Sequence, residues 1–123
     1  MEQAPTLWLV WSNAPSEAIA QQLAHTLLAE RLVACAHLFP GGRSIYHWQG
    51  QLEESVEWTL MFKTTAERYP AMVERLRGLH PHETPEILAT PVVAADPRYA
   101  AWVIESTAPL PVTPEDARSG AHG

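Results

Sequence analysis

The chain has 123 residues, of which 46% are apolar, and a formal net charge of −6 at neutral pH. This length and composition predict one folded domain whose core needs neither a disulfide nor a metal. The acidic balance leaves no basic patch for phosphates, which argues against nucleic acid as a partner. A single cysteine, the lack of a visible leader and the lack of an apolar run near the roughly 20 residues of a membrane span predict a cytoplasmic protein.

The N-terminal part predicts a strand followed by a helix. Residues 6–12 form a continuous apolar run, typical of a strand covered on both faces. Apolar residues at helical spacing predict a helix over about 15–30, with Pro15 in its first turn.

A long hairpin follows in the sequence. Residues 32–39 and 44–48 both read as strand, and Pro40-Gly41-Gly42 between them predicts a bulge within one strand. Gln49-Gly50 predicts a tight turn into an antiparallel strand whose best alternation runs over 56–64.

The second half predicts a helix, a strand and a short helix. Apolar residues from Tyr69 to Leu79 have helical spacing. Pro70 allows the first residue of this helix to be placed only to within one turn. Residues 86–95 predict a strand at a sheet edge or with a bulge, because Pro91 lies within it. Asp96-Pro97 predicts the cap and first turn of a third helix.

The order β-α-β-β-α-β predicts an α+β fold, the ferredoxin-like plait, as a single domain over residues 1–106. Residues 107–123, rich in Pro and Gly, are expected to be a loosely ordered tail. Both helices of a plait lie on one face of the sheet. The strands nevertheless lack clean polar alternation, so we expect another subunit to cover the second face.

Chain length supports the same expectation. A strand from residue 51 to residue 64 extends about 45 Å, whereas a globule of this size is roughly 35 Å across. The hairpin is therefore expected to project beyond the helices and to carry exposed aromatic residues such as Trp48, which favours oligomers.

Alternation also predicts which side chains share a face. Ala34, Ala36 and Leu38 are expected to face the helices, which places Cys35 and His37 on the opposite face. In the next strand, Val56, Trp58, Leu60 and Phe62 are expected on one face and Lys63 on the other.

Cys35 and His37 offer a thiolate and an imidazole, ligands that suit Cu(I), Cu(II) or Zn(II). Simple packing is the alternative for each of them at this stage, because lone cysteines are often buried. Lys63 either binds an anion, pairs with Glu83 or Glu86, or is solvated.

The densest set of potential ligands lies in residues 80–87. His80, His82, Glu83 and Glu86 occur there between two prolines that stiffen the segment. Metal ligation or acid–base chemistry is one interpretation, and imidazoles at a helix C-terminus are the other. The segment matches no HExxH, CxxC or EF-hand pattern, and the chain has no visible nucleophile with an adjacent base. We therefore predict no enzymatic activity.

Four ordered segments resemble the CutA family of divalent-cation tolerance proteins. They are LVACAHLFP (32–40), SIYHWQG (44–50), FKTT (62–65) and HPHETPEI (80–87). The resemblance covers roughly residues 7–106. It implies a ferredoxin-like homotrimer, related in architecture to PII signalling proteins, with clefts between subunits and a link to copper and other divalent metals.

The resemblance also assigns positions. The cysteine of the family's VAC segment is Cys35, and the histidine and glutamate of its HPYE segment are His80 and Glu83. Its hairpin tryptophan, KT lysine and PEI glutamate are Trp48, Lys63 and Glu86, which we treat as candidate ligand-binding residues. One departure is His82, where the family commonly has tyrosine.

These observations lead to a preferred hypothesis and two alternatives. The preferred one is a homotrimer that binds copper or a similar divalent ion at intersubunit clefts, through Cys35, His80, His82 and Glu83, without an organic cofactor. A PII-like sensor that binds a small anionic metabolite through Lys63 is the first alternative. A scaffold trimer that presents its hairpin tips to partners is the second.

Overall fold

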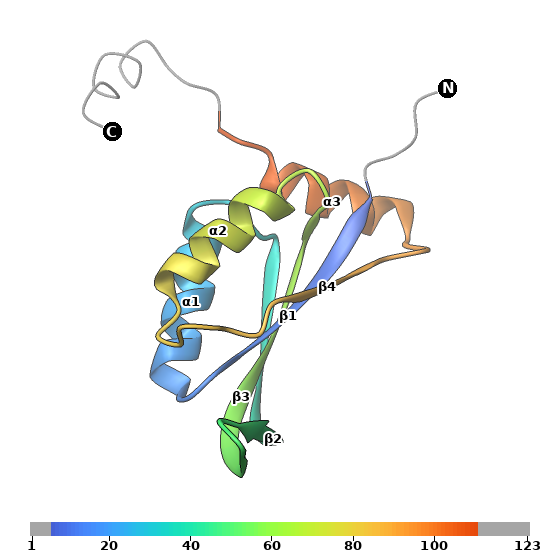
Figure 1. Cartoon of the computed structure of the whole chain (residues 1–123). Coiled ribbons are helices and arrows are strands. Elements are labelled where there is room, and N and C mark those ends of the chain that lie inside the picture. The colour runs from blue at the N-terminus through green and yellow to red at the C-terminus, as the bar shows by residue number, and fades with distance from the viewer. Residues whose placement is uncertain (1–5, 111–123) are drawn as a thin grey trace, which may run out of the picture.

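A computed structural model describes residues 6–110. In chain order, its elements are β1 (Leu7–Ala14), α1 (Glu17–Ala29), β2 (Cys35–Trp48), β3 (Gln51–Thr65), α2 (Tyr69–Leu79), β4 (Leu88–Pro91) and α3 (Pro97–Thr107). The strands form one antiparallel sheet in the order β2-β3-β1-β4 (Figure 1). This is the predicted plait, so the fold class is confirmed.

Helices α1 and α2 cover one face of the sheet, which we call the helix face. Alternate strand residues such as Val10, Leu60 and Phe62 are fully buried against the apolar stripes of both helices. Helix α1 begins where the Ser16 hydroxyl accepts a hydrogen bond from the Ile19 N–H. Helix α2 begins at Tyr69 with Pro70 in its first turn, which settles the boundary that the sequence left open.

The predicted bulge is present in β2. Register shifts between Phe39 and Gly42, so two residues of β2 lie opposite one residue of β3. Gly41 there has a φ of +78°, a conformation that favours glycine. The extra residue reverses which residues of β2 point to each face of the sheet. Before the bulge, odd-numbered Cys35 lies opposite odd-numbered Lys63, so the odd-numbered residues of both strands share a face. After the bulge, even-numbered Ser44 lies opposite odd-numbered Ser55.

Helix α3 packs against one end of the second face, which we call the open face. Val103 of α3 forms a small apolar cluster with Leu7 and Ala34. The expectation that Ala34 faces α1 and α2 was therefore wrong. Ala34 precedes β2, and its backbone conformation is not bound to the alternation of that strand. Ala36 and Leu38 do pack on the helix-face core, as predicted.

Arg31 attaches α3 to the α1–β2 connection. Its Nε donates to the carbonyl of Ala108 and its Nη2 to that of Glu105, both at 2.8 Å. A cation thereby binds two carbonyls at the C-terminus of α3, of which that of Glu105 also accepts the Ala108 N–H at 3.3 Å. Arg31 itself adopts a φ of +57°, a conformation that is costly for a residue with a Cβ.

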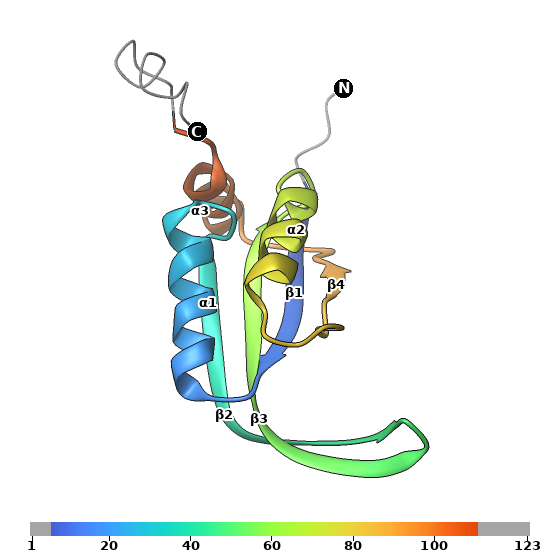
Figure 2. The same ribbon diagram turned by 60° about the vertical axis from the view of Figure 1, so that its left-hand side comes forward.

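The β2–β3 hairpin extends past the helices, and its tip bends away from the sheet (Figures 1 and 2). The predicted projection is confirmed, together with the turn at Gln49-Gly50. Val56 shares the face of Leu60 and Phe62, as expected, but it is 58% exposed because it lies in this projecting part. Strand β4 covers only residues 88–91 of the predicted 86–95, at the edge that Pro91 had indicated.

Within the described residues, none of the helices combines the length and the apolar character that crossing a membrane requires. The predicted tail starts at residue 107, where α3 ends, and most of it lies outside the described residues.

Candidate functional site

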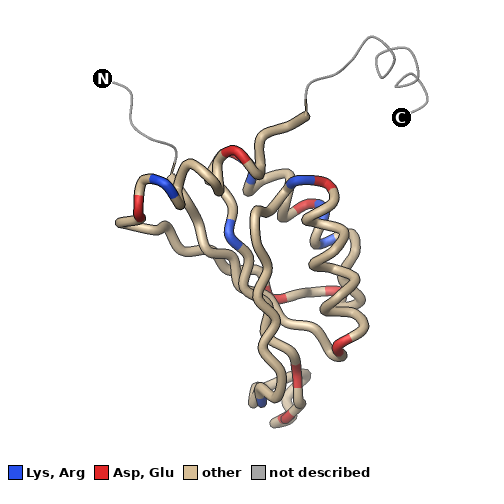
Figure 3. The backbone as a smooth tube through the Cα atoms, turned by 180° about the vertical axis from the view of Figure 1, so that it is seen from behind, with Lys and Arg blue, Asp and Glu red and all other residues tan. Residues whose placement is uncertain are grey.

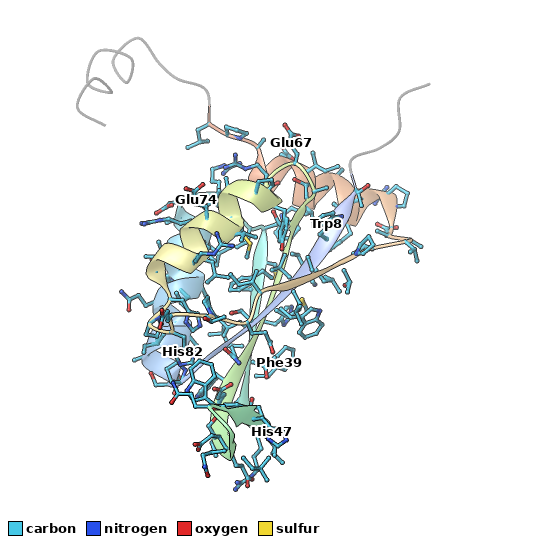
Figure 4. All side chains as sticks on the ribbon, in the orientation of Figure 1. Trp8, Phe39, His47, Glu67, Glu74 and His82 are labelled. Carbon is cyan, nitrogen blue, oxygen red and sulfur yellow. The ribbon has the colours of Figure 1, made fainter. Side chains whose placement is uncertain are left out.

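The predicted site residues fall into two separate places on the sheet. Cys35 pairs with Lys63, which lies opposite Leu9 near the start of β1. His80 instead contacts Asn13, four residues farther along β1, or roughly 13 Å at strand spacing. In Figure 4, Trp8 marks the first end of β1, and His82 lies toward the other. One chain therefore does not bring Cys35 and His80 together.

His80 caps the C-terminus of α2 and is only 7% exposed. Its Nε2 lies 2.7 Å from the carbonyl oxygen of Asn13, which can only accept, so Nε2 carries the proton. Its Nδ1 accepts the His82 backbone N–H at 3.1 Å. Both ring nitrogens are thus occupied, and the neutral tautomer is specified. A metal could bind this imidazole only if one of these bonds were broken.

The environment of His80 disfavours its charged form. Burial is the main cause that lowers the pKa of this imidazole, and the nearby His82 ring lowers the pKa further. The bond to Asn13 and the charge of Glu57 act in the opposite direction but do not prevail. His80 therefore anchors the 80–87 segment to the end of β1 as a neutral residue.

Sequence reasoning missed a polar cluster at the root of the hairpin. The carboxylate of Glu57, only 9% exposed, accepts hydrogen bonds from the Asn13 amide at 2.7 Å, from the Ser44 hydroxyl at 3.0 Å and from the Ser55 hydroxyl at 3.3 Å. The bulge puts Ser44 on the same face as Glu57, so the glycine pair was the signal that could have indicated this cluster. The Asn13 Oδ1 atom is buried here without a partner among the described residues.

The residues that follow His80 are exposed. His82, with its ring centroid 4.8 Å from that of His80, points outward, as do Glu83 and Glu86. Trp48 is 52% exposed at the far end of β2, in the projecting hairpin. Within residues 6–110, no three His, Cys, Asp or Glu side chains are close enough to hold a metal ion.

Cys35 and Lys63 lie side by side on the open face, as the alternation predicted. The thiol is half-buried and free. Lys63 Nζ donates to the Tyr99 hydroxyl of α3 at 2.9 Å, and this bond is the main cause that raises the pKa of the lysine. Lys63 and Arg43 are the only lysine or arginine residues in the four strands, which Figure 3 shows as mostly uncharged.

Between this pair and the Glu57 cluster, the open face is mainly apolar and only partly covered. In one row across the sheet, His37, Met61, Trp11 and Leu88 are adjacent. Leu88 is 61% exposed and Phe39, toward the hairpin, is 45% exposed. This surface fits contact with another protein chain better than contact with water.

Comparisons with known proteins agree with this architecture. Residues 8–106 match the family described as CutA1 divalent ion tolerance protein. A divalent-cation tolerance protein CutA from Escherichia coli O81 is 46% identical over 95 residues, which cover 77% of this chain and 85% of that protein.

Solved structures give the same result. A divalent cation tolerance protein from Thermus thermophilus superposes with a TM-score of 0.81 at 40% identity, covering 83% of this chain and 99% of that one. CutA1 from Oryza sativa superposes with a TM-score of 0.83 at 28% identity, covering 85% and 96%. By sequence and by fold, this chain belongs to the CutA1 divalent ion tolerance protein family.

Proposed function

We propose that the protein acts in tolerance to divalent metal ions as a homotrimer and that it binds copper or a similar ion between subunits. The observation that carries this proposal is the division of the candidate ligands between two distant places in one chain. Cys35 lies on the open face, whereas His82 and Glu83 lie at the opposite end of β1. A complete site would require groups from two chains.

The surface of the sheet supports assembly. The row that contains Trp11 and Leu88 leaves apolar side chains partly exposed, and the hairpin tip adds Ile45, Trp48 and Leu52, each more than half exposed. Burial of such surface against other copies is favourable by about 25 cal/mol per Å². The edge strands β2 and β4 also leave backbone groups free for pairing with a neighbour.

Within the metal site, the side chains would have different roles. Exposed His82 and Glu83 offer an imidazole and a carboxylate, and Cys35 offers a thiol, a donor set that suits copper or zinc. His80 would position His82, because its Nδ1 holds the His82 backbone. The imidazole of His82 adds a nitrogen donor where the resemblance implies a phenol. Tolerance would then result from binding, with no catalytic step.

Calorimetric titration with Cu(II) and Zn(II) tests the metal proposal. We expect Cys35→Ala and His82→Gln each to weaken binding at least about tenfold, the usual effect of losing one ligand or its support. His25→Gln is the matched control, because His25 is an exposed histidine on α1, away from the proposed ligands. Equal affinities in all four proteins would remove these residues from the role.

Sedimentation tests the assembly independently of metal. Leu88→Glu places a charge on the open face. Because Leu88 is exposed in the single chain, the variant should still fold. Leu28→Glu, on the solvent side of α1 at 37% exposure, is the control. We expect the first variant to dissociate and the second to stay trimeric. A wild-type chain that sediments as a monomer at micromolar concentration would contradict the proposal. Cell fractionation tests the predicted cytoplasmic location.

A further inference from the structure

A cavity of about 580 Å³ lies between α3 and the open face of the sheet. This volume is within the range of sites that bind small molecules. The walls are mainly apolar and come from three segments: Leu7 and Leu9 of β1, Val92 after β4, and Val103 of α3. Leu7 and Val103 are themselves buried, so these walls are held in place by packing.

One cation faces this apolar space. Lys63, the only lysine in the sequence, lines the cavity beside Tyr99. The Tyr99 hydroxyl accepts one of the three ammonium hydrogens at 2.9 Å, and the ring centroid lies 5.1 Å from Nζ. These contacts fix the ammonium in position while two of its N–H donors stay available for a ligand.

Within the part of the chain that the structure describes, the charge of Lys63 has no direct counter-charge. Among residues 6–110, the ion pairs join Arg43 to Glu54 and Arg75 to Glu30, and neither includes the lysine. Asp96 also lines the cavity, but its carboxylate accepts the Tyr99 backbone N–H at 3.0 Å and caps α3. The bond to Tyr99 raises the pKa of Lys63, which keeps the ammonium protonated at neutral pH.

We propose that this cavity binds a small organic monoanion, a carboxylate with an apolar body. The carboxylate would accept hydrogen bonds from Lys63, and the hydrocarbon part would pack against the apolar walls. A charged hydrogen bond at one end of the cavity discriminates for one end of such a ligand. A neutral alkane would leave the ammonium without a partner, and a polyanion would carry more charge than one cation balances and would be repelled by Asp96. The inference does not depend on metal binding.

Octanoate is the probe, used with the full-length protein in buffer that contains EDTA. Because the chain has one lysine, protein labelled with ¹³C at the lysine ε position gives a single lysine signal. We expect octanoate to shift this signal saturably at up to millimolar concentration. Octyltrimethylammonium, with the same chain length and the opposite charge, should not. Absence of a saturable shift overturns the proposal. That result is also expected if a second copy of the chain fills the cavity, and it counts against the proposal in that case too.

Variants locate the binding, and their octanoate affinities are compared with wild type by calorimetric titration, because Lys63→Met has no lysine signal to observe. Lys63→Met keeps the length of the side chain and removes its charge, and we expect it to weaken octanoate binding at least about tenfold. Ala95→Phe places a bulky ring at an exposed position of the cavity wall and should weaken binding without burying anything new. Arg77→Met is the control, because it removes the charge of an exposed arginine on α2, away from the cavity. This variant should bind octanoate as wild type does. Wild-type affinity in either of the first two variants contradicts the proposal.

Discussion

Protonation of His80 is expected to make the stability of this protein depend on pH below about 6.5. In the folded chain, this imidazole is neutral and buried, with its pKa lowered mainly by burial. In the unfolded chain, it takes up a proton at its ordinary pKa of about 6.5. Above that pH, both states are neutral and the full stability is present. As pH falls, the unfolded state gains the proton first, so unfolding becomes more favourable.

The magnitude follows from proton linkage. Between the unfolded pKa and the lower folded pKa, one group changes the free energy of unfolding by at most about 1.4 kcal/mol per pH unit and per chain. The physical cause is visible in the structure. Protonation of Nδ1 would turn the acceptor of the His82 backbone N–H into a second donor, and two donors would then face each other.

Urea unfolding between pH 7.5 and 5, with EDTA and a fixed protein concentration, measures this dependence. His80→Gln keeps a donor for Asn13 and an acceptor for the His82 N–H but cannot titrate, so it should lose this part of the slope. His25→Gln is the matched control, because it removes an exposed imidazole on α1 and leaves the surroundings of His80 intact, so the part of the slope that His80 causes should stay. Identical slopes for wild type and His80→Gln would refute the reasoning.

Three further predictions concern the framework of the site. Arg31→Ala should speed amide hydrogen exchange in the last turn of α3 and lower the free energy of unfolding by roughly 1–2 kcal/mol. Arg31→Gly should recover part of this loss, because glycine suits a φ of +57°, and equal losses in the two variants would contradict the assigned strain. Gly41→Val should destabilise the bulge by about 1–2 kcal/mol in thermal unfolding, and an unchanged Tm would be inconsistent with the left-handed conformation there. Glu57→Ala leaves three donors without their acceptor and should cost about 2–4 kcal/mol in urea unfolding, and an unchanged free energy of unfolding would contradict the role given to these hydrogen bonds.

Residues 80–87 show what the sequence could and could not predict about the candidate site. Their density of imidazoles and carboxylates was evident, and so was their place between a helix and a strand. The difference between His80 and His82 was not. One is buried with both nitrogens bonded, and the other is exposed. That difference arises from the carbonyl of Asn13, 67 residues away in the chain.

Lys63 gives the same lesson for the open face. Alternation placed this lysine and Cys35 on the same face, because side chains in a strand repeat every two residues. Its hydroxyl partner Tyr99, 36 residues further on, depends on where α3 docks, and local pattern does not report docking.

The sequence by itself determined the order of strands and helices, the bulge at Pro40–Gly42 and the cap of α3 at Asp96, because periodicity, glycine and proline act on their own neighbourhood. Only the tertiary structure decided that Cys35 and His80 are separated, that Glu57 is buried among hydroxyl and amide donors, and that Lys63 faces an apolar cavity. These outcomes depend on register and packing between segments tens of residues apart. The free energy of such contacts is shared by the whole fold and is not encoded at any one position.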